Sequence, residues 1–301
     1  MSVEDYQWPD FDFKLNSFNS TPKTSASAQD MLHKIEDFYS QKFNTPAYLF
    51  PSARAGLSAI FRFKNISRQH TLFAPKWSSH CVWDVISRYA NPTSVHYPNI
   101  DLALVVHKWG YQFQTTLQDP SKIIHDSVDS IFTSYQLSLP SAEFEVLSLP
   151  KILGTFCGGI VFSKNKSFDQ FMLQLRQNSS LGLATFQEKH KLDELKQTQI
   201  ITTWQADEWR NFLLTEVATK RLEIVSKKLN IDYLSIGSER LPCNIPLEVS
   251  RHHFKKPEML IKRQFNFSFK NEMDSFLPAY LLPIHIGISE ERFQAMLRAI
   301  A

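Results

Sequence analysis

The residue best suited to covalent chemistry is Lys151, which stands alone between two apolar segments, Phe144–Leu147 and Gly159–Ser163. Both segments have the length and composition of buried strands. Partial burial at the edge of such strands removes water from an ammonium group and favours the neutral amine. A neutral amine can attack a carbonyl carbon and form a Schiff base. Most lysines are exposed, so the alternative is a loop lysine that faces water. The other segments of the chain are needed to choose between the two interpretations.

A second candidate is a phosphate-binding turn that follows the apolar run Ala47–Phe50. Pro51 ends this run, and Ser52 then occupies the position of a helix N-cap. Small residues at the start of the helix leave backbone N–H groups and a hydroxyl facing outward, as in helix N-termini that hold phosphate. Most such turns bind nothing, so Ser52, Ala53 and Arg54 need support from other sites.

An acidic residue follows a third apolar run, Lys122–His125. Asp126 stands at its carboxyl end, and ligands of open α/β sheets bind at this edge. A carboxylate there can hold a proton on a heterocyclic nitrogen and keep a pyridinium ring cationic. The alternative is that Asp126 only caps a helix.

A phosphate anchor, a strand-end acid and a strand-edge lysine, in this order, are what a pyridoxal 5'-phosphate (PLP) enzyme needs. A ring should also cover the face of the pyridine. Trp77 and His80 are both candidates, since both follow the predicted strand Thr71–Ala74. The sequence does not choose between them, and Trp77 could equally be an ordinary packed aromatic residue.

The elements needed to position these residues alternate along the first half of the chain. Helical spacing predicts helices over Ala28–Phe43, Ala53–Phe63 and Ser79–Tyr89. Between and after them lie the predicted strands, which include Leu102–Val106. Short apolar strands that alternate with helices predict an α/β fold: a large domain with a mainly parallel mixed sheet flanked by helices.

The pattern changes near Phe168, where long helical segments begin. We expect helices over Phe168–Gln177, Phe186–Gln199 and Trp204–Leu229. Strands are then expected over Asn244–Val249, Phe265–Phe269 and Tyr280–Ile284. A last helix, capped by Ser289, is expected over Glu290–Ile300. We therefore predict a large domain over residues 1–229, with an N-terminal arm, and a small C-terminal α/β domain over residues 230–301.

Composition excludes several classes of protein. A net charge of +3 without a Lys/Arg run argues against nucleic acid as a partner. Three separated cysteines without a CxxC motif indicate a reducing compartment. No apolar run is long enough for a membrane span, and the acidic N-terminus has no signal-peptide pattern, so we expect a cytoplasmic protein. The histidines, including adjacent His252 and His253, show no metal-ligand spacing.

Six segments together resemble the DegT-like sugar aminotransferases, which belong to the aspartate-aminotransferase fold type of PLP enzymes. Ser148–Phe162 is similar to the family's Ser-Phe…Lys…Gly-Gly segment, which places Lys151 at the Schiff-base position. Ile124–Asp129 is similar to its Glu-Asp-x-Ala-[His/Gln] motif, which places Asp126 at the ring-nitrogen position. The remaining segments that carry the resemblance are Phe50–Ile60, Phe73–Pro75 with the residues after it, Val105–Gly110 and Leu282–Glu291.

The chain departs from the family pattern at several points. Ala53 replaces a usual glycine, and Asp129 replaces the His or Gln that approaches the phenolic oxygen of the cofactor. Ser148 and Lys151 are closer together than usual, and no Gly-Tyr-Asn-x-Arg stretch follows Ser180. These changes affect the expected substrate more than the expected cofactor.

The resemblance implies a PLP-dependent aminotransferase that uses an amino-acid donor and a nucleotide-linked keto sugar, for polysaccharide or antibiotic synthesis. It also implies cofactor contacts from Ser52, Ala53, Arg54, Asp129 and Ser148, and a homodimer, because the sites of the family lie across a two-fold interface. The alternatives are a PLP-fold protein that has lost or altered catalysis and now binds or regulates a partner, and a PLP lyase.

Overall fold

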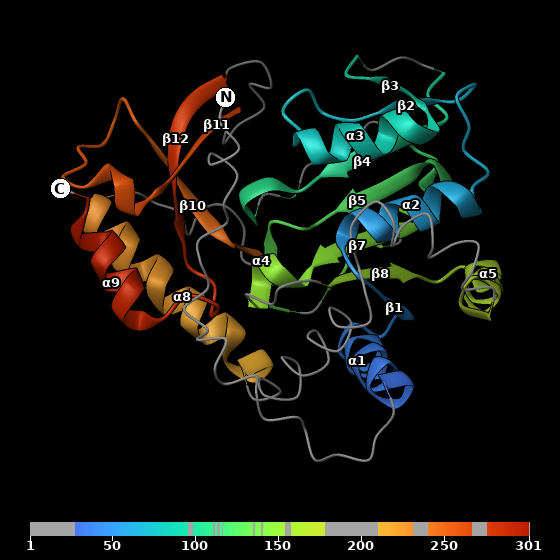
Figure 1. Cartoon of the computed structure of the whole chain (residues 1–301), viewed down its shortest axis with the longest axis horizontal. Helices are drawn as coiled ribbons and strands as arrows, with labels where there is room; N and C mark the ends of the chain where they lie inside the picture. The colour runs from blue at the N-terminus through green and yellow to red at the C-terminus, as the bar shows by residue number, and fades with distance from the viewer. Residues whose placement is uncertain are drawn as a thin grey trace.

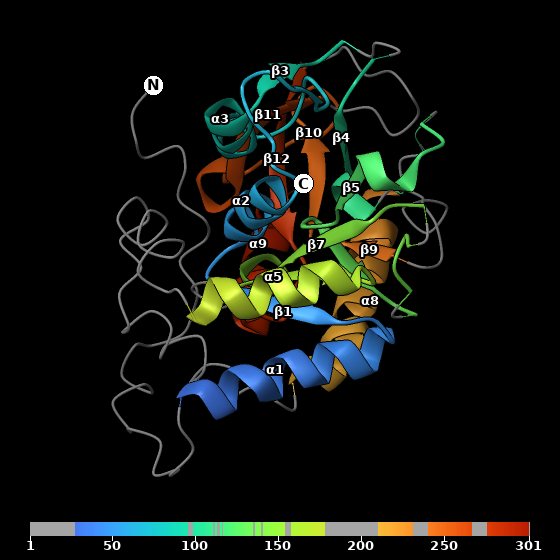
Figure 2. The same cartoon turned by 90° about the vertical axis from the view of Figure 1, so that its right-hand side faces the viewer.

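The computed structural model describes residues 28–95, 99–110, 112, 115, 117–134, 136–139, 141–153, 158–177, 210–230, 240–266 and 276–300. Figure 1 shows a central sheet with helices on both sides, and Figure 2 shows the same arrangement from the side. Within the described residues, no helix is long and apolar enough to cross a membrane.

The sheet has seven strands in the order β1-β8-β7-β5-β4-β2-β3. Strand β8 is antiparallel to β1 and to β7, and every other neighbouring pair is parallel. The central strands are apolar on both faces, as expected for a sheet covered by helices on both sides. The strands are β1 (Ala47–Phe50), β2 (Thr71–Phe73), β3 (Asn91–Thr93), β4 (Leu102–Val106), β5 (Ile123–Asp126), β7 (Phe144–Ser148) and β8 (Gly159–Ser163).

Two hydrophobic clusters form the core. One joins α2 (Ala53–Phe63), α3 (His80–Tyr89) and α5 (Lys166–Gln177) to the sheet, through residues such as Ile60, Ile86, Phe144 and Phe168. The other joins α1 (Ala28–Phe43) and α8 (Arg210–Leu229) to the strands, through residues such as Tyr39, Leu147, Phe162 and Leu222. The sheet is thus a buried layer between helices, and polar side chains within it need partners from neighbouring elements.

The C-terminal part contains a sheet in the order β10-β12-β11, beside α8 and α9 (Figure 1). Its residues Leu247, Leu282 and Phe293 share one core cluster with α1 and β8. Strand β9 pairs with β6, which lies between β5 and β7 in the chain. The elements are β6 (Ser130–Phe132), β9 (Arg240–Pro242), β10 (Asn244–Glu248), β11 (Ile261–Asn266), β12 (Phe276–Pro283) and α9 (Glu290–Arg298). The domain boundary at residue 230 stays a prediction.

The predicted elements of the large sheet are confirmed, several of them to the residue. Ser52 caps α2 as expected, because its Oγ accepts a hydrogen bond from the backbone N–H of Ala55. The alternative of a water-facing loop lysine does not apply, because Lys151 lies in the short helix α4 (Leu149–Leu153) and its side chain is 20% exposed. Strand β11 begins at Ile261, before the predicted start. The helix expected over Phe186–Gln199 lies outside the described residues.

Gly159 allows the first turn of α2 to approach β8 closely. A Cβ on this residue would lie 2.3 Å from the backbone nitrogen of Ala53 and 2.4 Å from the carbonyl carbon of Ser52. Both of these are backbone atoms, which cannot rotate away. Ser52 also forms a bridge with Gly158, so the cap of α2 is joined directly to the start of β8.

We therefore expect Gly159→Ala to lower the free energy of unfolding by about 1–3 kcal/mol, the usual cost of overpacking. Gly56→Ala is the comparison, since its added methyl meets side-chain atoms, a methyl of Val161 at 2.4 Å and the ring of Phe50 at 3.6 Å, instead of backbone atoms. Urea unfolding monitored by circular dichroism checks both variants. Equal stability of Gly159→Ala and wild type would contradict the close approach.

Candidate active site

The candidate residues meet because parallel strands end at the same edge of a sheet. Strands β1, β2, β4, β5 and β7 all point the same way, with β8 reversed between β1 and β7. The residues that follow their carboxyl ends are therefore brought to one edge, which is where open α/β sheets bind ligands. These residues are Ser52, Trp77, Lys108, Asp126 and Lys151.

Lys151 pairs with Asp129 at this edge. The Nζ atom of Lys151 donates to Oδ1 of Asp129 at 2.6 Å, and the two side chains are only 20% and 11% exposed. Helix α4 begins directly after β7, and the backbone N–H of Leu149 donates to the carbonyl of Gly158. Asp129 precedes β6, and its carbonyl accepts from the N–H of Cys243. Both partners are thus held by backbone contacts on opposite sides of the ion pair.

The environment of Lys151 works in two directions. Desolvation lowers its pKa, but the charge and hydrogen bond of Asp129, together with the charge of Asp126, outweigh this effect and raise the pKa above its ordinary value. The expectation that burial alone would neutralise this amine is therefore wrong for the ligand-free site. The amine stays an ammonium until one of the two carboxylates finds another partner.

Asp126 is the last residue of β5 and is only 1% exposed. Desolvation raises its pKa to about 6, although the charges of Lys151 and Lys108 and the N–H of Val128 oppose this rise. No helix begins at Asp126, because β6 follows after a short turn, so the helix-cap alternative does not apply. A buried carboxylate of this kind gains from a cation or a protonated nitrogen beside it.

The N-terminus of α2 is available at the same edge. Ser52, Ala53 and Arg54 are partly exposed, whereas the helix is buried from Ala55 to Phe61. Its cap bridges Gly158, and Gly159 pairs with Ser148, the last residue of β7. The start of α2 and the start of α4 therefore lie on either side of the Gly158–Gly159 turn. This arrangement puts free N–H groups close to the segment that carries Lys151.

The two candidate ring-covering residues have different surroundings. Trp77 is 5% exposed, and the Nζ atom of Lys108 lies 5.1 Å from its ring centroid. His80 is exposed at the first position of α3. Its neighbour Cys81 is close enough to Lys151 to affect the pKa of that lysine, so the start of α3 also lies at this edge. The geometry leaves the choice between Trp77 and His80 open.

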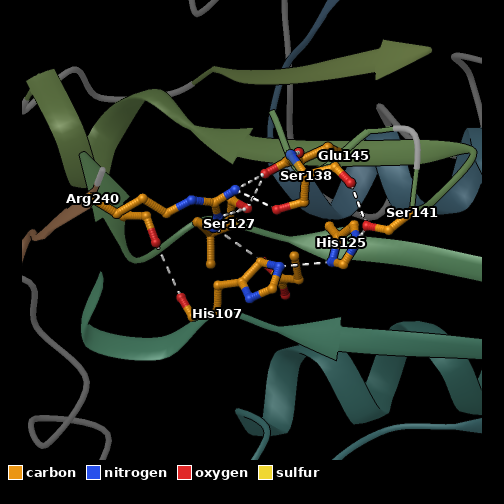
Figure 3. A network of polar contacts seen from close by, with 10 residues as sticks. His107, His125, Ser127, Ser138, Ser141, Glu145 and Arg240 are labelled. Atoms are coloured by element: carbon orange, nitrogen blue, oxygen red, sulfur yellow. Dashed lines mark hydrogen bonds and ion pairs between the residues drawn. The ribbon is translucent and has the colours of Figure 1, made fainter. Parts of the chain in front are cut away.

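A buried polar network lies behind Asp126 and was not predicted (Figure 3). Arg240 pairs with Glu145 at 2.8 Å and donates to Ser127 Oγ at 2.7 Å, and both charged side chains are almost fully buried. The rings of His107 and His125 are stacked, with Nε2 of one 2.6 Å from Nδ1 of the other. Desolvation and the charge of Arg240 lower the pKa of His125 to about 4. The glutamate in an apolar strand was a visible signal, but its partner more than 90 residues later was not.

Among the described residues, no group of three or more His, Cys, Asp or Glu side chains could hold a metal ion. The network in Figure 3 instead fixes the turn after β5, because Ser127 and His125 flank Asp126 directly. We infer that Arg240 and Glu145 have a structural role and that chemistry belongs to the edge with Lys151.

The ion pair predicts how Lys151 reacts with aldehydes. Asp129→Asn removes the charge that holds the ammonium, so the pKa of Lys151 should fall and the neutral amine should become more abundant. Each unit of pKa raises the neutral fraction about tenfold. Reductive methylation with formaldehyde at pH 8, read by peptide mass spectrometry, should therefore label Lys151 severalfold faster. Glu216→Gln breaks an exposed pair with Lys220 and is the control; an unchanged Lys151 rate in Asp129→Asn would refute the pairing.

The raised pKa of Asp126 predicts a pH dependence of stability. The folded protein binds this proton more tightly than the unfolded chain, so ionisation destabilises the fold as the pH rises from about 4 to about 6. Asp126→Asn has no ionisable group at this position, so its unfolding free energy does not fall for this reason. In ligand-free protein, the unfolding free energy of the variant minus that of wild type should rise across this window by up to about 3 kcal/mol. Urea unfolding at several pH values measures it, and a pH-independent difference would contradict a buried Asp126.

A family model described as "Putative PLP-dependent aminotransferase" matches residues 35–241, and no curated protein sequence matches. The structure of 8-amino-7-oxononanoate synthase from Francisella tularensis is similar, with TM-score 0.58, 14% identity and 95% and 90% of the two chains covered.

Two further structures have the same fold. One is DesV of S. venezuelae, with TM-score 0.58, 14% identity, and 94% of this chain and 91% of that chain covered. The other is described as "Putative sugar aminotransferase Spr1654 from Streptococcus pneumoniae, PMP-form", with TM-score 0.56, 13% identity and 94% and 92% covered. The identities are low, so these likenesses establish the fold alone. The family match spans more than half of the chain, and with the fold it leads to one conclusion: the protein belongs to a family of PLP-dependent aminotransferases.

Proposed function

We propose that this chain transfers an amino group from an amino acid to a keto sugar, most simply a nucleotide-linked one, as a DegT-like enzyme. The motif resemblance supports this choice of substrate, and so does the structural similarity to a protein described as a sugar aminotransferase. The observation that carries the proposal is the shared edge, where the Lys151 amine and the buried Asp126 carboxyl act on each other electrostatically.

The residues at this edge fit the cofactor. Lys151 would attach the aldehyde, and Asp126 would hold the proton of the ring nitrogen. The N–H groups at the start of α2, with Ser52, Ala53 and Arg54, would hold the phosphate. The absence of a side chain on Gly159 keeps this helix end close to the strand, since a Cβ there would overlap the backbone of Ala53.

The remaining predicted contacts are secondary in this proposal. Trp77 or His80 would cover the ring, and Ser148 would line the site beside the start of α4. Asp129 would face the phenolic side of the ring, where it now holds the ammonium of Lys151.

PLP supplies an electron sink that stabilises negative charge at the substrate Cα. This chain must supply the proton movements. With the cofactor bound, Lys151 would act as general acid and base: it would take the proton from the substrate Cα and deliver it to the C4′ carbon of the cofactor. Asp126 must stay ionised for the ring nitrogen to keep its proton. Asp129 can accept a proton from Lys151 or return one, because the two groups are already hydrogen-bonded.

A homodimer and a cytoplasmic location remain part of the proposal. The family resemblance supports the dimer, since the sites of related enzymes are completed across a two-fold interface. Sedimentation of purified protein tests the dimer, and a fully active monomer would overturn it.

The Asp129 substitution favours a second candidate, a PLP-binding protein with altered or lost turnover. A carboxylate beside the reacting amine holds it as an ammonium and opposes its attack on an aldehyde. Bound cofactor without amino transfer to any keto sugar would select this candidate. Loss of ammonia or carbon dioxide without an acceptor would instead indicate a lyase.

Lys151→Ala should abolish covalent attachment of PLP. After PLP addition and borohydride reduction, wild type should gain one reduced cofactor on the peptide that contains Lys151, and the variant should gain none. Lys220→Ala is the matched control, because Lys220 is exposed on α8, where it pairs with Glu216. A reduced cofactor on another lysine of wild type would reject the proposed anchor.

Amino transfer is tested with glutamate, glutamine and a panel of nucleotide-linked keto sugars. We expect the absorbance of the bound cofactor to change with an amino donor and to recover with one of the keto sugars. Asp126→Asn should lower this turnover by about a hundredfold or more, since loss of a key electrostatic contact in an active site has this typical scale. Full turnover in this variant would remove Asp126 from the mechanism.

A further inference from the structure

The sequence analysis gave no role to Lys108, although this residue stands at the site edge. It stands two residues after the end of β4, whose last residue, Val106, is the register partner of Asp126. The intervening His107 donates its backbone N–H to the carbonyl of Asp126 at 2.8 Å. The backbone therefore places Lys108 beside the end of β5 with little freedom.

The local backbone is held in an unusual conformation that maintains this placement. Trp109 has a φ of 58°, in the left-handed region that side chains other than glycine seldom adopt, and Gly110 has a φ of 82°. A Cβ on Gly110 would lie within 3.3 Å of backbone atoms of Arg240, Leu241 and Pro242. The close contact with β9 therefore fixes the turn that carries Lys108, and such strained turns occur at functional sites.

The ammonium of Lys108 is buried between aromatic rings. The residue is 6% exposed, and its Nζ atom lies 5.1 Å from the ring centroid of Trp77 and 5.2 Å from that of Trp109. It also donates to the carbonyl oxygen of Trp77 at 3.3 Å. Aromatic faces attract a cation, so the two rings stabilise the ammonium group of Lys108 at this position.

We propose that Lys108 is a positioning residue of the cofactor site, which holds Trp77 in place and supplies a fixed positive charge beside Asp126. The need for such a charge follows from the role of Lys151. In the ligand-free site, Asp126 interacts with two cations, Lys151 and Lys108, and with the anion Asp129. With the cofactor attached, Lys151 would lose the ammonium that now acts on Asp126, and Lys108 would keep a positive side chain of the protein beside the carboxylate that holds the proton of the ring nitrogen.

Only the role of Lys108 in the cofactor-loaded enzyme rests on the proposed function. The electrostatic link between Lys108 and Asp126 exists in the ligand-free chain and can be measured there. Among the described residues, the other ionisable groups near this edge include Cys81 on α3, Cys243 after β9, and the network of His107, His125, Glu145 and Arg240 behind Asp126. These groups are the same in all the variants below, so they affect the titration midpoint of Asp126 equally in each.

The test is a pH titration of Asp126 in the full-length, cofactor-free protein. The readout is the ¹³C NMR signal of labelled aspartate carboxyl carbons. The signal that is missing in Asp126→Asn assigns the resonance. Lys108→Met keeps the length of the side chain without its charge, and it should raise the midpoint of Asp126 by about half a pH unit or more. Lys108→Gln is a second neutral variant that can still donate to the Trp77 carbonyl, and Lys108→Arg should keep the wild-type midpoint.

Lys122→Met is the matched control. Lys122 stands just before the opposite end of β5 and donates to the carbonyl of Ile100 at 3.4 Å, so its loss should leave the midpoint unchanged. A purely structural Lys108 would lower stability without moving the midpoint. Equal midpoints in wild type, Lys108→Met and Lys108→Gln would therefore overturn the inference, whichever of them is less stable.

A PLP titration of the same variants separates this inference from the proposed function. If wild type binds PLP, Lys108→Met should bind it severalfold more weakly, and Lys108→Arg should bind it nearly as well as wild type. If wild type binds no PLP, the proposed function fails, whereas a shifted Asp126 midpoint still supports the electrostatic role of Lys108. Unweakened PLP binding in Lys108→Met would contradict its role in the loaded site.

Discussion

The balance of charge at one edge of the sheet is the constraint on which the site depends. Two carboxylates, Asp126 and Asp129, meet two ammonium groups, Lys108 and Lys151, where little water can reach them. Burial of an unpaired charge is costly, so each of these groups needs the others. A cofactor that takes the amine of Lys151 and offers Asp126 a protonated nitrogen exchanges one set of partners for another. The charged groups of the site therefore have partners before the cofactor binds and can have partners after it binds. This exchange of partners is how a stable fold can hold a reactive lysine.

The fold brings these groups together through strand direction and two close backbone contacts. Parallel strands deliver their carboxyl ends to one edge, and the reversed β8 returns the chain there at Gly158 and Gly159. The bare Gly159 lets the first turn of α2 lie against this return. Behind the site, the Arg240–Glu145 pair ties β9 to the centre of the sheet. Removal of one partner from such a buried pair leaves an uncompensated charge, so the C-terminal part is coupled to the strand beside Asp126.

Periodicity and turn residues were sufficient to predict six of the seven strands of the large sheet, because the apolar runs of these six are short, separate and bounded by Pro, Ser or Asp, whereas the edge strand β3 has no apolar run. They predicted that Ser52 caps a helix and that Asp126 ends a strand, and the structure confirms both. They failed where structure depends on distant partners. The three-residue strands β6 and β9 have no pattern of their own and exist because they pair with each other. The raised pKa of Lys151 likewise depends on Asp129, which spacing alone could not place 2.6 Å away. Lys108 was missed for the same reason, since its aromatic neighbour Trp77 comes 31 residues earlier.

The central claim is that one edge of the sheet holds all three parts of the cofactor. The most direct measurement is a crystal structure of the protein after PLP is added. The account predicts continuous density from Nζ of Lys151, with the ring nitrogen within hydrogen-bonding distance of Asp126 and the phosphate at the first turn of α2. Cofactor density that is attached elsewhere, or a ring nitrogen far from Asp126 with Lys151 still paired to Asp129, would contradict it.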